Sequence, residues 1–182
     1  MKRLFVAVLA TAIGFSVPSL TASENSTETV FSDNFNDTRT SRTQWTVTPG
    51  SDVQFLSEGG EDGGGCVRVS TPQRAACSIT RKITGLQPER LYRVSARFRC
   101  DSVSEGRGAV LSLKPDDSRD QPWNASQFVY GTTGWETVYM DFLSDPAGNA
   151  SICAGVGFPW PTSNGGTAKG TVYIDDIQVI PT

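Results

Sequence analysis

The sequence predicts an all-β protein, a jelly-roll β-sandwich of two antiparallel sheets. Apolar and polar residues alternate with a period of two in many short segments, as they do in strands with one buried face. Clusters of Gly, Pro, Asn, Asp and Ser separate these segments about every ten residues, which is typical of a sandwich. No window of about a dozen residues carries the apolar stripe of an amphipathic helix.

The N-terminal segment is typical of a secretory signal peptide. Lys2 and Arg3 precede residues 4–17, which are almost free of polar side chains. This apolar run of about 14 residues is shorter than the roughly 20 that span a bilayer, so we expect no membrane span. Cleavage is expected after Ala22, which follows other small residues. The expected organisation is a signal peptide (residues 1–22), a short polar linker (23–28) and one secreted domain, extracellular or periplasmic (29–182).

The composition excludes several kinds of chemistry. Removal of Lys2 and Arg3 with the signal leaves 14 basic against 19 acidic residues, so nucleic acid is not an expected partner. Histidine is absent, which excludes a Ser-His-Asp or Cys-His mechanism and most catalytic zinc sites. A glycosidase needs only two carboxylates, which Glu105, Glu136 and Asp141 could supply. No acidic pair shares an outward strand face with aromatic residues, however, so we do not expect an enzyme.

Short alternating segments account for most of the domain. The segments expected to be strands are 29–35, 45–47, 53–56, 66–70, 77–83, 91–100, 109–113, 127–130, 135–142, 152–158 and 171–180. The clearest of them is 91–100, where apolar residues occupy every second position and Arg93, Arg97 and Arg99 share the opposite face. Such a strand has one buried face.

The four cysteines are expected to form two disulfides, because their number is even and the compartment is oxidising. Cys66 and Cys77 flank a turn-rich segment that contains Pro72, so a hairpin would place them opposite each other. Cys100 would then pair with Cys153. The alternative is four buried thiols, since the spacing matches no metal motif.

A series of motifs follows in a recognisable order along the domain. It comprises Phe31-Ser-Asp-Asn-Phe-Asn36, Trp45, Ile83-Thr-Gly-Leu-Gln-Pro88 leading to Tyr92, Gly134-Trp135-Glu136, and Gly170-Thr-Val-Tyr-Ile-Asp-Asp-Ile-Gln-Val179. Together these motifs resemble the carbohydrate-binding modules appended to bacterial cellulases and xylanases, within the galactose-binding-like jelly-roll superfamily. The resemblance covers essentially the whole domain. It implies non-catalytic binding of a polysaccharide or oligosaccharide, and we expect a monomer.

The resemblance also implies a structural calcium ion held between the first and last strands. In the family its ligands are an N-terminal acidic residue, main-chain carbonyls and an aspartate of the last strand, which correspond here to Asp33 or Asn36 and to Asp175. Calcium prefers six to eight hard oxygen ligands, and Asp175 would otherwise interrupt an apolar strand. Asn36 stands where the family commonly has glutamate and offers only a neutral oxygen. The alternative is a β-bulge at Asp175 and Asp176 with an outward carboxylate.

Sugar binding in this superfamily depends on exposed aromatic rings that stack on pyranose faces. Trp160, between two prolines, is the leading candidate, followed by Trp123 and then by Tyr139 and Tyr130. If these rings instead fold back on the core, the protein is an extracellular structural or adhesion domain without a sugar ligand.

The row of arginines on segment 91–100 has two interpretations. Arg93, Arg97 and Arg99 could bind uronate, sulfate or sugar hydroxyls bidentately if their face is a binding groove. Alternatively, they form a solvated row that faces carboxylates on neighbouring strands. The register of those strands decides between the two.

Overall fold

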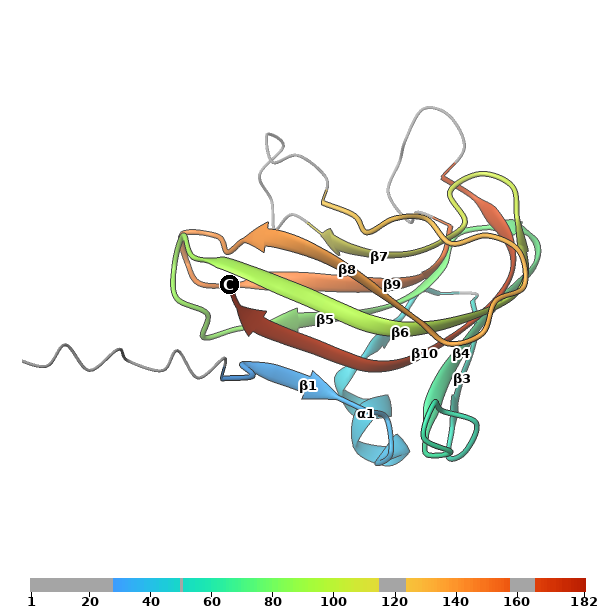
Figure 1. Cartoon of the computed structure of the whole chain (residues 1–182), viewed down its shortest axis with the longest axis horizontal. Coiled ribbons are helices and arrows are strands. Elements are labelled where there is room, and N and C mark those ends of the chain that lie inside the picture. The colour runs from blue at the N-terminus through green and yellow to red at the C-terminus, as the bar shows by residue number, and fades with distance from the viewer. Residues whose placement is uncertain (1–27, 50, 115–123, 158–165) are drawn as a thin grey trace, which may run out of the picture.

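The computed structural model describes residues 28–49, 51–114, 124–157 and 166–182, which form a β-sandwich with one short helix (Figure 1). The strands are β1 (Phe31–Asp33), β2 (Thr46–Val47), β3 (Asp52–Leu56), β4 (Cys66–Ala75), β5 (Cys77–Ile83), β6 (Leu91–Ser104), β7 (Ala109–Lys114), β8 (Glu136–Leu143), β9 (Ala150–Val156) and β10 (Ala168–Pro181), and helix α1 spans Thr38–Gln44. The predicted all-β jelly-roll class is confirmed.

The strands form two antiparallel sheets. The six-stranded sheet has the order β3-β4-β10-β6-β8, with β1 also paired to β10, and the four-stranded sheet has the order β2-β5-β9-β7. Strand β10 pairs with β4 along its first half and with β1 along its second, where Phe31 lies opposite Val179. The first and last strands are therefore neighbours, as the resemblance implies (Figure 1).

The core lies between the inner faces of the two sheets. In β6 the side chains of Val94 and Phe98 are fully buried, and the neighbouring Arg93, Arg97 and Arg99 alternate with them on the other side. The rings of Tyr92 and Phe142 stack with centroids 5.8 Å apart, and the Tyr92 hydroxyl accepts the Gln87 N–H at 2.9 Å. The face predicted to be buried in segment 91–100 is thus confirmed.

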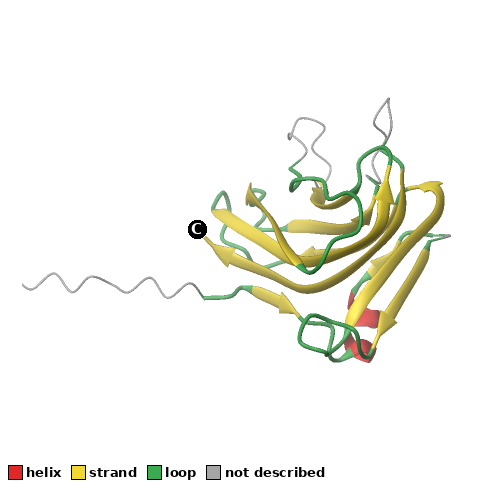
Figure 2. Ribbon diagram, turned by 45° about the vertical axis from the view of Figure 1, so that its right-hand side comes forward, coloured by secondary structure: helices red, strands yellow, loops and turns green. Residues whose placement is uncertain are grey.

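Two local predictions are wrong. Helix α1 was not expected, because its seven residues carry no apolar stripe (Figure 2). The sequence does mark the start of this helix, because Asp37 is a preferred N-cap residue. Its carboxylate accepts the Thr40 N–H at 3.1 Å. The segment 127–130 is not a strand but an extended chain beside β7, joined to it by isolated bridges such as Ala109 with Val129.

The predicted disulfides are not formed, and all four cysteines are buried thiols. The segment around Pro72 is not a hairpin turn but the continuation of β4, whose 10 residues extend over about 33 Å and separate Cys66 from Cys77. Cys100 faces the core from β6. Cys153 alternates with core residues along β9 and so lies on that strand's opposite face.

The described residues include no helix that is long and apolar enough to cross a membrane.

Candidate functional site

The outer face of the six-stranded sheet collects the arginines of β6 and three aromatic rings. The register of β6 places Arg93 opposite Asp141 and Arg97 opposite Thr137 on β8, and Arg99 opposite Tyr173 on β10. We call this surface the guanidinium–aromatic face; it comprises Arg93, Arg97, Arg99, Trp135, Thr137, Tyr139, Asp141 and Tyr173. The alternation that buries one side of β6 in the core leaves every second residue on this surface.

At one end of the face, Arg93 is held by a carboxylate and a ring. Its Nε and Nη2 donate to the two oxygens of Asp141 at 2.7 and 2.9 Å. Its guanidinium lies 4.6 Å from the centroid of the Tyr139 ring, which remains 54% exposed. The bidentate bond raises the pKa of Arg93 and lowers the pKa of Asp141. Tyr139 is therefore an oriented and accessible ring.

In the middle of the face, Arg97 is occupied in the same way. Its guanidinium donates through Nε and Nη2 to both oxygens of Glu61, which lies on the glycine-rich loop between β3 and β4. It also donates to the Thr137 hydroxyl. Arg93 and Arg97 are thus paired within the fold, so a clamp of three free guanidinium groups is not present.

Arg99 differs from its neighbours on the strand. Its guanidinium carbon lies 4.1 Å from the centroid of the Tyr173 ring and 5.3 Å from the Trp135 ring, and no carboxylate among the described residues pairs with it. Its Nε is buried without a hydrogen-bond partner. In the part of the chain that the structure describes, the contacts recorded for this guanidinium are with these two rings.

Two of the three residues proposed as calcium ligands, Asp175 and Asn36, contact the same glycine-rich loop between β3 and β4. Asp175 accepts the Glu61 N–H at 3.0 Å, and the carboxamide oxygen of Asn36 accepts the Gly65 N–H at 2.6 Å. A Cβ on Gly60 would lie 2.6 Å from the Asp175 carboxylate, so only glycine permits this approach. Burial raises the pKa of Asp175, although the N–H donors of Glu61 and Asp176 oppose that shift.

This arrangement is an incomplete set of calcium ligands. The described residues contain no group of three or more acidic or thiol side chains placed to hold a metal. A calcium ion beside Asp175 and Asn36 would need main-chain carbonyls and water for most of its ligands. Calcium binding therefore stays a prediction.

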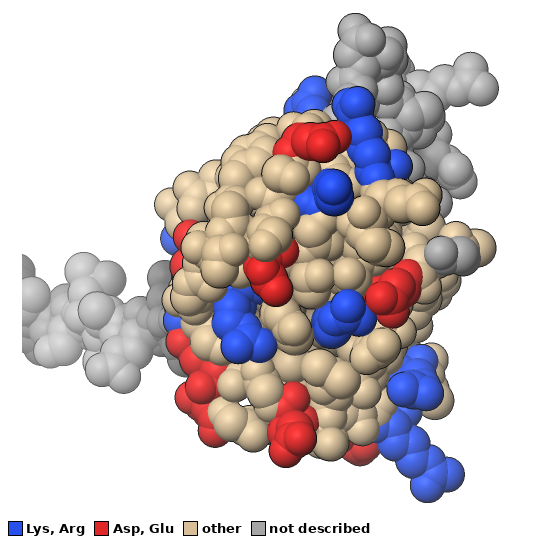
Figure 3. Space-filling view, turned by 90° about the vertical axis from the view of Figure 1, so that its right-hand side faces the viewer, with Lys and Arg blue, Asp and Glu red and all other residues tan. Residues whose placement is uncertain are grey.

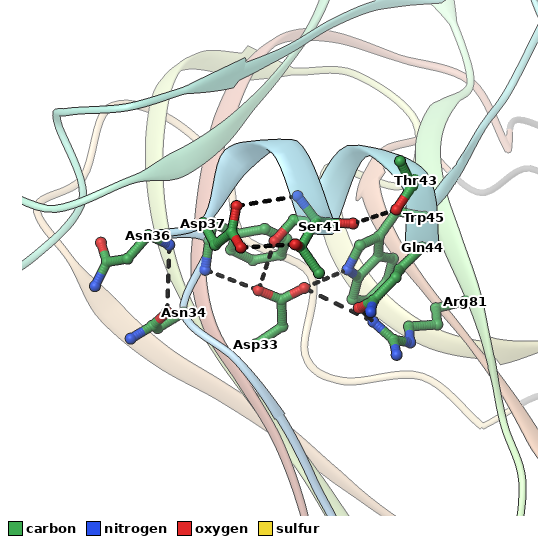
Figure 4. A network of polar contacts seen from close by, with 11 residues as sticks. Asp33, Asn34, Asn36, Asp37, Ser41, Thr43, Gln44, Trp45 and Arg81 are labelled. Atoms are coloured by element: carbon green, nitrogen blue, oxygen red, sulfur yellow. Dashed lines mark hydrogen bonds and ion pairs between the residues drawn. The ribbon is translucent and has the colours of Figure 1, made fainter.

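Asp33 belongs to a different network (Figure 4). One carboxylate oxygen accepts the Phe35 N–H and the Ser41 hydroxyl, each at 2.9 Å. The other accepts the indole N–H of Trp45 at 2.8 Å and lies 3.8 Å from Arg81. These donors let Asp33 fasten β1 to α1, and its role as a calcium ligand stays a prediction.

The candidate rings do not all lie together. Tyr139 is on the guanidinium–aromatic face, whereas Tyr130 lies beside the start of β7, 47% exposed, with its hydroxyl donating to the Gly106 carbonyl at 2.9 Å. Trp123 and Trp160 lie outside the described residues. Sequence reasoning did not single out Tyr173, although its place two residues before Asp175 on an alternating strand was the available signal.

Charge is mixed over the surface. Seen from the right-hand side of Figure 1, basic and acidic groups are interspersed among uncharged residues (Figure 3). This face carries no single-sign field of the kind that attracts nucleic acid.

Comparison with solved structures identifies the fold. The chain is similar to the CBM22-2 xylan-binding domain of Paenibacillus barcinonensis Xyn10C, with a TM-score of 0.60 and 15% identity over 84% of this chain and 99% of that one. It is similar to the C-terminal family 22 module of Clostridium thermocellum Xyn10B, with a TM-score of 0.61 and 15% identity over 86% and 96%. It is also similar to TmCBM61 in complex with β-1,4-galactotriose, with a TM-score of 0.52 and 16% identity over 76% of this chain and 88% of that one.

Comparison by sequence does not identify a family. No family model matches the chain, and no curated protein matches it. The chain thus has the β-sandwich fold that these carbohydrate-binding modules share.

Proposed function

We propose that this protein is a secreted, non-catalytic carbohydrate-binding module that takes a polysaccharide chain on exposed aromatic rings. The observation that carries the proposal is the alignment of nearly the whole of a xylan-binding domain with this chain. The ring of Tyr139, exposed and oriented by Arg93, supplies the kind of surface on which a pyranose stacks.

The guanidinium–aromatic face offers more than one ring to a single chain. Trp135 directly precedes β8 and Tyr139 is the fourth residue of that strand, so their α-carbons are at most about 13 Å apart. Hydroxyl and guanidinium groups lie between them, as at Thr137 and Arg97. A linear polysaccharide along β8 would contact both rings.

Two surfaces are therefore proposed for sugar contact, namely the guanidinium–aromatic face and the segments that carry Trp123 and Trp160. Affinity electrophoresis and calorimetry with xylan and β-1,4-galactan test the proposal on the wild type. Tyr139→Ala should weaken binding if the face is used, and Trp160→Ala or Trp123→Ala if the tryptophan-bearing segments are used. Val30→Ala, which shortens an exposed apolar side chain outside the guanidinium–aromatic face, is the control.

The proposal makes two demands on the results. At least one polysaccharide must be retained by the wild type, and at least one of the three ring variants must lose about tenfold in affinity, since stacking energies are of that order. No retention on any neutral or acidic polysaccharide would reject it. Release of reducing ends, abolished by Glu136→Gln, would show an enzyme instead.

A further inference from the structure

Arg99 is the one arginine of the guanidinium–aromatic face whose hydrogen-bonding groups are unused by the described residues. Arg93 and Arg97 each make bidentate bonds to a carboxylate, whereas Arg99 makes none. An arginine carries five N–H donors, and those of Arg99 make no hydrogen bond among the described residues. The contrast lies within one strand, at positions two and six residues apart.

Two aromatic rings contact the guanidinium of Arg99. Tyr173 lies 4.1 Å and Trp135 5.3 Å from it, on the neighbouring strand β10 and on the segment that leads into β8. Stacking of this kind leaves the edge of a guanidinium available, and that edge matches the two oxygens of a carboxylate or sulfate. Because the rings hold the side chain, little conformational entropy is lost when an anion binds.

The surroundings select the kind of anion. Aromatic rings on both sides of the charge suit a sugar, which stacks an apolar face while its acidic substituent meets the cation. The Nε of Arg99 is buried, so the accessible donors are those at the end of the side chain. A compact oxyanion attached to a sugar ring can reach these donors.

We propose that Arg99, held between Tyr173 and Trp135, binds the oxyanion of an acidic polysaccharide. The inference rests on the proposed carbohydrate-binding function and specifies its substrate class. The shared chemistry is a carboxylate of a uronic acid or a sulfate ester, and the experiment below separates these sources.

The test is calorimetric titration of the whole protein with polygalacturonate, dextran sulfate, xylan and dextran. We expect Arg99→Gln to lose at least about tenfold in affinity for one of the two acidic polymers and to keep its affinity for any neutral polymer. The control is Arg74→Gln, which removes the same charge from an exposed arginine outside the guanidinium–aromatic face, where it pairs with Glu105 at 3.9 Å. It should change the affinity less than about twofold.

A second variant distinguishes the loss of the guanidinium geometry from the loss of a positive charge. Arg99→Lys keeps the charge but not the planar fork, so it should fall between the wild type and Arg99→Gln. A melting temperature of Arg99→Gln equal to that of the wild type shows that the fold is intact. If that variant is unstable, Trp135→Phe, which keeps a ring beside the guanidinium, should retain acidic binding.

The outcomes are distinct. Preference for polygalacturonate identifies a uronate site, and preference for dextran sulfate identifies a sulfate site. Equal losses in Arg99→Gln and Arg74→Gln, or binding of neutral polymers only, would overturn the inference while leaving the proposed function standing. Binding of none of the four polymers, together with none of those tested above, would overturn both.

Discussion

Single buried polar residues fix the geometry of the N-terminal region. Asp33 joins the N–H of Phe35, the hydroxyl of Ser41, the indole of Trp45 and the guanidinium of Arg81 (Figure 4). A carboxylate can accept all these donors, because it has two oxygens and about four lone-pair sites. Asp33 thus has a structural role that its predicted role as a calcium ligand did not anticipate.

We predict that Asp33→Asn lowers the free energy of unfolding by roughly 1 to 3 kcal/mol, because an amide group would turn an N–H toward the Trp45 N–H or the Phe35 N–H. Urea unfolding followed by circular dichroism measures the loss. Asp52→Asn is the control, since Asp52 forms an exposed pair with Arg68 at 3.1 Å and a long contact with the Gln54 amide at 3.5 Å, and should cost well under about 1 kcal/mol. Equal effects of the two substitutions would contradict the role assigned to Asp33.

The cysteines give a second prediction for individual residues. Burial raises the pKa of Cys100 to about 12, and burial also raises the pKa values of Cys66 and Cys77. Because the thiolate is the reactive form, native protein should react with a thiol reagent at pH 8 only slowly. Four thiols should appear in denaturant without reductant. Detection of no thiols until a reductant is added would instead support the two predicted disulfides.

At the scale of elements, the β-bulge of β10 is where the sheet changes partner. Asp175 and Asp176 lie where β10 passes from pairing with β4 to pairing with β1, and the register against β6 shifts there. Asp176 adopts a φ of 46°, a conformation that aspartate and asparagine tolerate better than most residues. The bulge considered from the sequence is therefore present, and it also holds the glycine-rich loop.

The bulge should make stability depend on pH. Burial raises the pKa of Asp176, and the charges of Asp62 and Glu61 raise it further. With a folded pKa above the ordinary 3.8, the folded chain binds more protons than the unfolded chain in that interval, so this group's contribution to stability falls as pH rises through it. We predict that Asp176→Asn raises the melting temperature at pH 7 by roughly a few degrees.

The gain should shrink as the pH is lowered, because the raised pKa lets Asp176 of the folded wild type take up its proton before the unfolded chain does. Thermal melts of both proteins between pH 4 and pH 7 measure it. Asn suits the positive φ, so the backbone is not a confounding cost. A gain that is the same at every pH would assign the effect to packing and not to charge.

Calcium bound at Asp175 would stabilise the same strand, β10. If the ion binds beside Asp175 and Asn36, millimolar calcium should raise the melting temperature of the wild type, because a ligand that binds only the folded state stabilises it. EDTA should reverse the increase, and Asp175→Asn should remove it. Identical melting curves in calcium and in EDTA would end the calcium prediction.

Elements with a strong period were predictable, and short or irregular ones were not. Segment 77–83 matches β5 at both ends, because apolar alternation and turn residues agree there. Strand β4 was ended too early, since Pro72 indicates a turn but is tolerated where the strand becomes exposed. The grouping of Arg99 with Trp135 and Tyr173 depends on the register of three separate segments, which no local pattern specifies.

At the scale of the whole molecule, the last strand holds the six-stranded sheet together. β10 pairs with β4, β6 and β1, so it joins residues from the beginning, middle and end of the domain. Its side chains Val172, Ile174 and Ile177 are fully buried in the core. A chain that lacks β10 would expose the edges of three strands as well as the inner faces of the sheet.

We predict that a chain ending at residue 167 does not fold cooperatively, whereas a chain of residues 28–182 does. Loss of β10 removes the partner of β4, β6 and β1 together, and non-local pairing of this kind cannot be replaced by local structure. Circular dichroism and thermal melting distinguish the two, with a sigmoidal transition expected only for residues 28–182. A cooperative transition in the shorter chain would show that the sandwich closes without its central strand, and the assignment of β10 as the organising element would then be wrong.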